Sequence, residues 1–322
     1  MHILHIEPQR YNAEVRSRLE TVGSVDFLDL HTHAELVKQI SSKPYQALFV
    51  KLGIPIDKAI LDAAPNLQFI VTPTTGLNHI DQEAAAERGI TVHSLKGEYE
   101  FLANIKSTSE HTWMLLMALV RRLPQAFSDV KQYHWRREPF LGMELNGKTL
   151  GVIGYGRLGR IVAQYGQAFT MRVLVNDTDP QQLENLPEGL EAVDLETLSR
   201  ESDIVTLHIP SNEENYHFLN TEKLQALKPG VVLVNTSRGE VLEESALLQA
   251  LQSGHLRGAA IDVIEGDSSW EQGVPEDHPL LEYAKMHENL LITPHIGGYA
   301  LESIEGTRAF VTDKFIHSLS TK

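Results

Sequence analysis

The stretch from Lys148 to Asp177, KTLGVIGYGRLGRIVAQYGQAFTMRVLVND, decides the fold of this chain. Its short apolar run from Thr149 to Ile153 predicts a buried strand, and apolar residues recur at helical spacing after Gly159. A second apolar run, Met171 to Val175, predicts another strand that ends close to Asp177. The stretch is therefore predicted to fold as a strand, a tight turn, a helix and a second strand.

Three glycines, Gly154, Gly156 and Gly159, form a GxGxxG pattern in the predicted turn. In a dinucleotide-binding unit the first permits the turn, the second lets the backbone approach a pyrophosphate, and the third lets helix and strand pack closely. The helix that follows offers free N–H groups and the positive end of its dipole. In this context the pattern predicts a dinucleotide site and disfavours the alternative, a purely structural glycine turn.

Asp177 lies about 20 residues beyond the glycines, where an acid binds the ribose hydroxyls of a dinucleotide. A carboxylate at this point repels a 2′-phosphate. The cofactor is therefore expected to be NAD and not NADP.

The composition excludes several classes of protein. With 322 residues the chain is long enough for two domains, and 42% apolar with 22% charged residues is ordinary for a globular protein. No apolar run approaches the roughly 20 residues of a membrane span, so no membrane partner is expected. The N-terminal MHILHIEPQRYN lacks the long apolar centre of a signal peptide, and a cytoplasmic protein is predicted.

Charge and cysteine content exclude further partners. The net charge of −15 would repel a phosphate backbone, so no nucleic acid is expected. The absence of cysteine excludes disulfides and thiolate metal sites. His31 and His33 have no third ligand at a plausible spacing, so HTH is predicted to be a polar helix start and no metal is predicted.

The first hundred residues alternate strand and helix patterns, which predicts a parallel sheet with helices on both faces. The expected strands are His2 to Ile6, Val25 to Leu28, Ala47 to Val50, Leu67 to Thr72 and Thr91 to His93. Lys51 follows the third of them, and Thr74, Thr75 and Gly76 follow the fourth. Since ligands bind beyond the carboxyl ends of parallel strands, both loops are candidates for a substrate. The alternatives are a solvated surface lysine and an ordinary turn.

A long amphipathic helix is predicted from Ile105 to Leu123, and four more apolar runs follow the glycine motif: Ile204 to His208, Val231 to Asn235, Gly258 to Val263 and Leu290 to Ile292. With the two strands of the motif they make six, the count for a doubly wound dinucleotide domain. Residues Leu301 to Leu319 are predicted to be a helix. Trp135 lies among charged residues and is assigned either to an interface or to core packing.

Three ionisable residues follow predicted strands of this second domain: Arg238, Asp267 and His295. Hydride transfer from an alcohol carbon needs a base for the hydroxyl proton, and His295 suits that role near neutral pH. Arg238 would bind a carboxylate through two hydrogen bonds, and Asp267, with Glu265 as its rival, would orient the imidazole. Singly, each has a plain structural alternative; together they favour catalysis on a 2-hydroxy or 2-keto acid.

At this point the chain resembles the D-isomer-specific 2-hydroxyacid dehydrogenases. The motifs that carry the resemblance are GYGRLG (154 to 159), LHIP (207 to 210), NTSRGEV (235 to 241), GAAIDV (258 to 263) and TPHIGG (293 to 298). The resemblance implies two doubly wound parallel-sheet domains, with a Rossmann NAD-binding domain at residues 104–298 inserted in a flavodoxin-like substrate domain at 1–103 and 299–322. It also implies a homodimer formed through the NAD-binding domain and its long helix.

The resemblance also implies roles for single residues. Arg238, Asp267 and His295 would be catalytic, and Lys51, Thr75, Gly76 and Leu77 would bind the substrate together with Arg238 and His295. The implied cofactor contacts, beside the three glycines and Asp177, are Thr108, Arg157, Leu158, His208, Pro210, Thr236, Ser237, Arg238, Asp262, His295, Gly297 and Gly298.

The expected function is NAD-dependent interconversion of a D-2-hydroxy acid and its 2-keto acid. The alternatives are phosphoglycerate dehydrogenase itself, in which Lys51 would meet a phosphate, and a non-catalytic NADH-responsive binding protein of the corepressor type. The sequence departs from the family in several places. It has EGDSSW where a glutamate followed by proline is usual, and Thr74 replaces the first glycine of the substrate loop. Lys51 stands where phosphoglycerate dehydrogenases have arginine, and KGEYEFLANIKSTSE is a longer approach to the helix than many members have.

Overall fold

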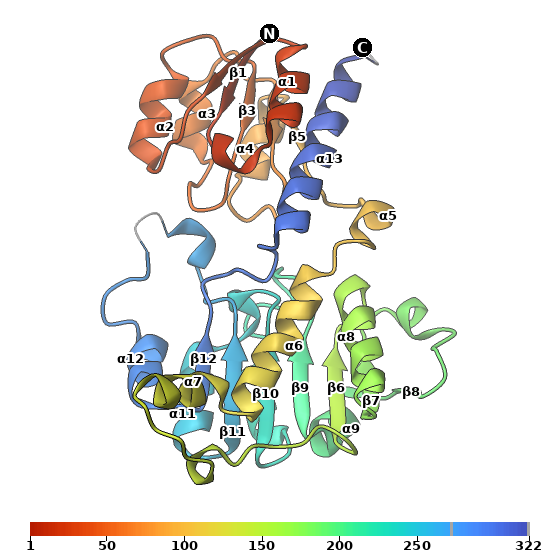
Figure 1. Cartoon of the computed structure of the whole chain (residues 1–322). Helices are drawn as coiled ribbons and strands as arrows, with labels where there is room; N and C mark the ends of the chain where they lie inside the picture. The colour runs from red at the N-terminus through yellow and green to blue at the C-terminus, as the bar shows by residue number, and fades with distance from the viewer. Residues whose placement is uncertain (271–272, 321–322) are drawn as a thin grey trace. The chain divides into compact units, whose positions relative to one another are not determined.

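A computed structural model describes residues 1–270 and 273–320 (Figure 1). The chain divides into two compact units. The first comprises Met1–Ile105, Gly266–Val274 and Tyr299–Lys322, and the second comprises Lys106–Glu265 and Pro275–Gly298. Both units are discontinuous in sequence. The short segment Gly266–Val274 belongs to the first unit, although the sequence assigned it to the NAD-binding domain.

The first unit contains a five-stranded parallel sheet in the order β2-β1-β3-β4-β5. This is the strand order of flavodoxin-like folds, which confirms the predicted fold. All five expected strands are present: β1 (His2–His5), β2 (Ser24–Phe27), β3 (Ala47–Phe49), β4 (Phe69–Val71) and β5 (Thr91–His93). The helices of the unit are α1 (Ala13–Glu20), α2 (His33–Ile40), α3 (Lys58–Ala63), α4 (Gln82–Glu87), α5 (Tyr99–Leu102) and α13 (Leu301–Ser320).

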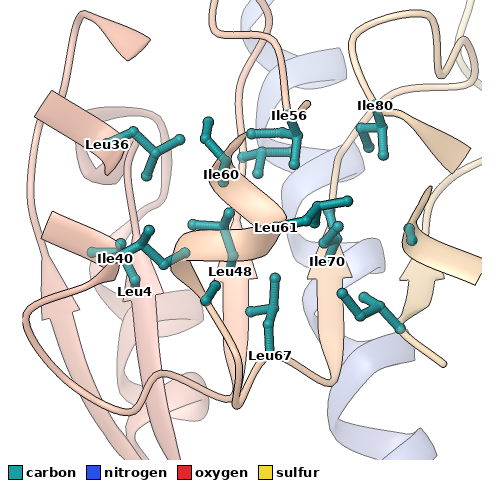
Figure 2. Close-up of a cluster of buried hydrophobic side chains, with 14 of the residues drawn as sticks. Leu4, Leu36, Ile40, Leu48, Ile56, Ile60, Leu61, Leu67, Ile70 and Ile80 are labelled. Atoms are coloured by element: carbon teal, nitrogen blue, oxygen red, sulfur yellow. The ribbon is translucent and has the colours of Figure 1, made fainter. Parts of the chain in front are cut away.

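The sheet of the first unit is buried on both faces because alternate side chains of each strand point to opposite sides. Leu4, Leu48 and Ile70 lie on one face and pack against residues of α2 and α3, as Figure 2 shows. Ile3 and Phe49 lie on the other face with Phe315 of α13. The last helix is therefore part of the core of this unit.

The start of α2 confirms the sequence interpretation of HTH as a polar helix start. Thr32 is the N-cap, and its side chain accepts a hydrogen bond from the backbone N–H of Glu35. The Glu35 carboxylate in turn accepts the backbone N–H of Thr32 at 3.0 Å. This reciprocal pair is a capping box, which satisfies two otherwise unpaired donors of the first turn.

The second unit contains seven parallel strands and not the expected six. They are β6 (Thr149–Ile153), β7 (Arg172–Asn176), β8 (Leu190–Ala192), β9 (Ile204–Leu207), β10 (Val231–Asn235), β11 (Leu256–Ile261) and β12 (Leu290–Ile292). The sheet order is β12-β11-β10-β9-β6-β7-β8. Read from β8 and numbered from β6 as the first strand, this order is 3-2-1-4-5-6, with β12 added as a seventh strand at the far edge. This is the Rossmann arrangement. The sequence missed β8 because this edge strand has only three residues, LEA, and no apolar run.

The helices of the second unit are α6 (Ser107–Val120), α7 (Leu123–Lys131), α8 (Arg157–Ala168), α9 (Leu195–Glu201), α10 (Thr221–Ala226), α11 (Glu244–Gln252) and α12 (Pro279–Met286). In Figure 1, α6 and α8 lie beside one another against the sheet of this unit. The predicted helix from Ile105 to Leu123 is shorter than expected because Arg122, at φ 54°, interrupts it. Short 3₁₀ turns are Pro8–Arg10, Glu138–Phe140, Pro180–Leu183, Gly239–Val241 and Asp267–Ser269.

Two sequence expectations concern the surface. Trp135 is 89% exposed, so the core-packing alternative for it is wrong. Among the helices in the described part of the chain, none combines the length and apolarity that a bilayer crossing requires.

Candidate active site

The glycine turn between β6 and α8 is tightly enclosed at two of its three glycines. A Cβ at Gly154 would lie 2.6 Å from the carbonyl oxygen of His208, and the backbone there has a φ of 90°. A Cβ at Gly159 would lie 2.0 Å from the carbonyl oxygen of Gly154. A Cβ at Gly156 would meet no described atom within 4 Å. Gly154 and Gly159 therefore serve packing, whereas Gly156 borders open space that a ligand could enter.

The surroundings of this turn fit a dinucleotide. Helix α8 begins without a side-chain cap and has no acidic residue in its first turn, so its N-terminal N–H groups and dipole can face an anion. Arg157 is the first residue of that helix, and burial lowers the pKa of its guanidinium from the usual value. Asp177 follows β7 and accepts backbone N–H groups from Tyr155 at 2.7 Å and Asp179 at 2.9 Å. These bonds hold the carboxylate beside the glycine turn and leave each oxygen a lone pair for ribose hydroxyls.

His208 follows β9, next to the strand that carries the glycine turn. Its Nε2 lies 2.9 Å from the hydroxyl of Thr206, and burial lowers its pKa to about 3. Its Nδ1 is buried and has no hydrogen-bond partner within the described residues. A histidine with such a pKa stays neutral at physiological pH, so His208 is not a proton donor in this site.

Arg238 lies in a turn that directly follows β10. The buried side chain of Asn235 organises this turn: its oxygen accepts the Ser237 backbone N–H at 3.0 Å, and its nitrogen donates to the Arg238 carbonyl at 2.9 Å. A Cβ at Gly239 would lie 2.2 Å from the backbone nitrogen of Glu265. Glycine at 239 is therefore required for the Arg238 turn to pack against the segment that follows β11.

His295 occupies a sharp bend after β12, where its backbone has a φ of 55°, in the left-handed region. Asp262 at the end of β11 holds this bend. Its backbone oxygen accepts the N–H of His295 at 2.8 Å, and its carboxylate accepts the N–H groups of Ile296 at 2.9 Å and Gly297 at 2.7 Å. Although burial opposes ionisation, hydrogen bonds from His111, Thr293 and these N–H groups hold the pKa of the Asp262 carboxyl below its usual value. Asp262, predicted as a cofactor contact, thus also positions the candidate base.

His111 and Thr293 complete this network, and neither was assigned a role from the sequence. The Thr293 hydroxyl donates to Asp262 Oδ1 at 2.5 Å, and His111 Nε2 lies 2.9 Å from that hydroxyl and 3.2 Å from Asp262 Oδ1. Because the hydroxyl proton already points to Asp262, His111 must be the donor in both contacts. The available signal was a histidine on the apolar face of a predicted helix.

The two candidates for the catalytic acid lie in different units. Glu265, in the second unit, binds the imidazole Nε2 of His217 at 2.9 Å and the hydroxyl of Tyr216 at 2.8 Å. Both bonds lower the pKa of Glu265 against the opposing effect of burial. Asp267, in the first unit, begins the 3₁₀ turn Asp267–Ser269. The Glu265 carboxylate is therefore committed to His217 and Tyr216.

The predicted substrate loop follows β4 in the first unit. Thr74, which stands in place of a glycine, makes its own network there: its hydroxyl lies 2.9 Å from that of Thr72 and donates to the Gly76 carbonyl at 2.8 Å. In the described part of the chain, the backbone N–H groups of Thr75, Gly76 and Leu77 make no hydrogen bond. Thr74 therefore shapes the loop while three adjacent donors are left for a ligand.

Lys51 follows β3, beside the strand that carries this loop. Its side chain is only 18% exposed, and its Nζ lies 3.3 Å from Asp29 Oδ1. The alternative of a solvated surface lysine is thus wrong.

The remaining predicted cofactor residues lie around the same turns of the second unit. Thr236 is buried, and its hydroxyl lies 2.7 Å from that of Thr112. A Cβ at Gly297 would approach the methyl group of Thr108 to 3.3 Å, so these two residues are neighbours. Ser237 is buried, Leu158 is half-buried, and Pro210 and Gly298 are exposed.

Together, the flavodoxin-like unit and the Rossmann unit with its glycine turn define the class of two-domain dinucleotide-binding proteins. Comparison with known proteins identifies the family. Residues 113–297 match the family model described as "D-isomer specific 2-hydroxyacid dehydrogenase, NAD binding domain". The chain belongs to the D-isomer specific 2-hydroxyacid dehydrogenase family, and its second unit is an NAD-binding domain.

Two curated relatives are 35% identical to the chain and each covers 84% of it. One is D-3-phosphoglycerate dehydrogenase of Archaeoglobus fulgidus, aligned over 269 residues, which are 48% of that protein. The other is glyoxylate reductase of Thermofilum pendens, aligned over 274 residues, which are 76% of that protein. The chain thus spans about half the length of the first relative and three quarters of the second.

Solved structures agree over the whole chain. The TT0316 protein of Thermus thermophilus is 33% identical with a TM-score of 0.82, covering 100% of this chain and 98% of that one. D-lactate dehydrogenase of Aquifex aeolicus, complexed with NAD and lactic acid, is 28% identical with a TM-score of 0.83, covering 100% and 96%.

Proposed function

We propose that this protein is an NAD-dependent oxidoreductase that interconverts a D-2-hydroxy acid and its 2-keto acid. When bound, NADH supplies the hydride and NAD⁺ accepts it. The proposal is supported by family membership and by the relatives, which include a glyoxylate reductase and a D-lactate dehydrogenase.

Each candidate residue has a defined task in this reaction. The guanidinium of Arg238 binds the substrate carboxylate through two hydrogen bonds and polarises the adjacent carbonyl. The N–H groups of Thr75, Gly76 and Leu77 bind the same carboxylate from the loop after β4. Protonated His295 donates its proton to the carbonyl oxygen during reduction and removes it from the hydroxyl during oxidation. Asp267 is proposed as the acid that stabilises the imidazolium.

The observation that carries the proposal is the placement of Arg238 and His295 after β10 and β12. Both strands pair with β11, whose last residues lead into Asp262, and all three run parallel. The two side chains therefore follow carboxyl ends of the same sheet, the edge at which such sheets bind ligands. The glycine turn after β6 belongs to that edge as well.

NADH oxidation tests this function. The purified protein is assayed with glyoxylate, hydroxypyruvate, pyruvate, phenylpyruvate and phosphohydroxypyruvate. We expect turnover on at least one keto acid and a loss of about 100-fold or more in kcat in His295→Ala, with NADH binding retained. His255→Ala is the matched control, because His255 immediately precedes β11 at the opposite edge of the same sheet.

Two narrower alternatives are decided by the same panel. A clear preference for phosphohydroxypyruvate would support phosphoglycerate dehydrogenase itself. Tight NADH binding without turnover on any keto acid would instead support a binding protein of the corepressor type and refute the proposed reaction.

We also propose that the protein forms a homodimer through the second unit. Large apolar side chains are exposed on α6, on α7 and on the segment that follows α7: Met114, Phe127, Val130, Tyr133, Trp135 and Leu141. Exposed apolar groups gathered in this way mark interaction surfaces. Light scattering after size exclusion is expected to give twice the chain mass of 36.0 kDa. In Phe127→Glu/Trp135→Glu the mass should fall to that of one chain; an unchanged dimer would place the interface elsewhere.

A further inference from the structure

A polar pocket of about 480 Å³ opens in the first unit. Three loops line it, and each follows one of three adjacent strands: Glu7 to Arg10 after β1, Asp29 to His31 after β2, and Lys51 to Ile54 after β3. In a parallel sheet of order 2-1-3-4-5 the strand order reverses between β1 and β3, and ligands bind in the crevice at that point. The pocket therefore occupies the place in this fold that favours ligand binding.

Charges around the pocket are partly balanced within the protein. The carboxylate of Glu7 is bound by the buried guanidinium of Arg308, whose Nη2 lies 2.6 Å away. Asp29 is bound by Lys51 at 3.3 Å and by the imidazole of His31 at 3.1 Å. Both acids are thus already paired with bases.

Arg10 supplies the remaining positive charge. Its guanidinium lies 4.9 Å from the centre of the Tyr299 ring, in a cation–π contact. The fixed charges on the lining balance, two acids against Arg10 and Lys51. Glu7 is paired with Arg308 behind the lining and Asp29 with Lys51, so within the described residues Arg10 is the lining cation without an acidic partner. An unpaired guanidinium in the pocket favours a ligand with a negatively charged group.

The other walls suit an apolar spacer. Leu52, Ile54, Trp270 and the Tyr299 ring line the same pocket. Its volume lies within the range of about 300–1,000 Å³ that is typical of pockets for whole small molecules. The pocket is therefore larger than a substrate with only a methyl side chain requires. Lys51 and the loop after β4 follow neighbouring strands, so a substrate bound by that loop can extend toward Lys51.

We propose that this pocket binds a second carboxylate at the far end of the substrate, so that the preferred substrate is a 2-keto dicarboxylic acid with a short carbon spacer. Arg10 is the residue that selects this carboxylate, with Lys51 as its partner. The inference rests on the proposed function and specifies its substrate class.

Kinetics with three matched keto acids tests the inference. The substrates are 2-oxoglutarate with a terminal carboxylate, 4-methyl-2-oxopentanoate with a neutral end, and phosphohydroxypyruvate with a dianionic end. We expect 2-oxoglutarate to have the highest kcat/KM. Arg10→Gln should lower that value roughly 10- to 100-fold, the effect of losing charge-assisted hydrogen bonds, mainly through KM. The value for 4-methyl-2-oxopentanoate should change less than about threefold.

Arg88→Gln is the matched control, because Arg88 lies in the same unit and pairs with Asp62 away from the pocket lining. It should leave all three values unchanged. A preference for the neutral substrate, a tenfold preference for phosphohydroxypyruvate, or an equal loss on all three substrates in Arg10→Gln would overturn the inference.

A binding measurement separates this inference from the proposed reaction. Titration calorimetry of 2-oxoglutarate and of 4-methyl-2-oxopentanoate onto the protein saturated with NAD⁺ involves no turnover. We expect 2-oxoglutarate to bind about tenfold more tightly, and Arg10→Gln to abolish the difference. Turnover on glyoxylate without this selectivity refutes the pocket's role alone, whereas selective binding without any turnover refutes the reaction alone.

Discussion

The Nε2 of His111 lies 3.2 Å from Oδ1 of Asp262, and both side chains are buried in the second unit. Helix α6 and strand β11 are thereby joined at the point where Asp262 also holds the bend of His295. The position of the candidate base thus depends on a helix that contributes no reacting group.

This network predicts the effect of substitutions at His111. His111→Phe removes a donor to Asp262 and should lower kcat about tenfold, while KM for NADH changes little. His111→Gln retains an N–H donor and should recover most of kcat. If the Phe and Gln variants lose stability equally but keep full kcat, the network serves folding and does not position His295. The matched control is His287→Phe, because His287 contacts a backbone carbonyl in the same unit.

Opposite outcomes are predicted for two glycines of the same motif. Gly156→Ala should leave the melting temperature nearly unchanged, because nothing described lies within 4 Å of the added Cβ, but weaken NADH binding about tenfold or more. Gly159→Ala should destabilise the protein by about 1–3 kcal/mol, because its Cβ would lie 2.0 Å from a carbonyl oxygen. Fluorescence titration of NADH and thermal melts check both. If Gly156→Ala binds NADH as tightly as the unsubstituted protein, the cofactor does not bind at this turn.

The catalytic acid is predicted to be Asp267. Asp267→Asn should lower kcat about 10- to 100-fold, because the proposed reaction would lose the negative charge that assists proton transfer by His295. Glu265→Gln should keep kcat within about threefold, since that carboxylate is bound by His217 and Tyr216. The reverse pattern in kcat, a large loss in Glu265→Gln and little in Asp267→Asn, would assign the role to Glu265.

A pH dependence of stability is predicted from His5. Burial and nearby Arg16 lower its pKa from 6.5 to about 3 in the folded protein. Between these values only the unfolded chain binds the proton, so stability is retained above pH 6.5 and falls as the pH decreases toward 3. In His5→Phe the slope of the unfolding free energy between pH 6 and 4 should be smaller by about 1.4 kcal/mol per pH unit. Urea titrations at several pH values measure it, and an unchanged slope contradicts the prediction.

The sequence predicted the main elements of both sheets because their central strands are continuous apolar runs. It missed β8, whose residues Leu190–Ala192 form a short, largely exposed edge strand. It also extended the first helix of the second unit through Arg122, because apolar spacing continues across that left-handed residue. A pattern of apolar residues indicates which segments are buried. It therefore predicts short or exposed elements poorly.

The candidate site was predicted where one motif holds its residues together, as in TPHIGG. Asp262 was predicted as a cofactor contact, but its role in positioning His295 was not. Its contacts to the backbone of residues 295–297 depend on how β11 and β12 pair. Arg10, Asp29 and His31 were not assigned a binding role. They lie in loops of separate strands, and only the order β2-β1-β3 makes those loops neighbours.

The packing of α13 also has a consequence for synthesis on the ribosome. Phe315 is fully buried, with its ring 5.4 Å from those of Phe49 and Phe69. The strands of the first unit emerge early, yet one wall of their core is translated about two hundred residues later. During synthesis, the sheet of the first unit therefore keeps one apolar face uncovered until α13 is translated. By then every strand of the NAD-binding unit has already been synthesised. Chaperone dependence of this protein should accordingly be set by its first hundred residues.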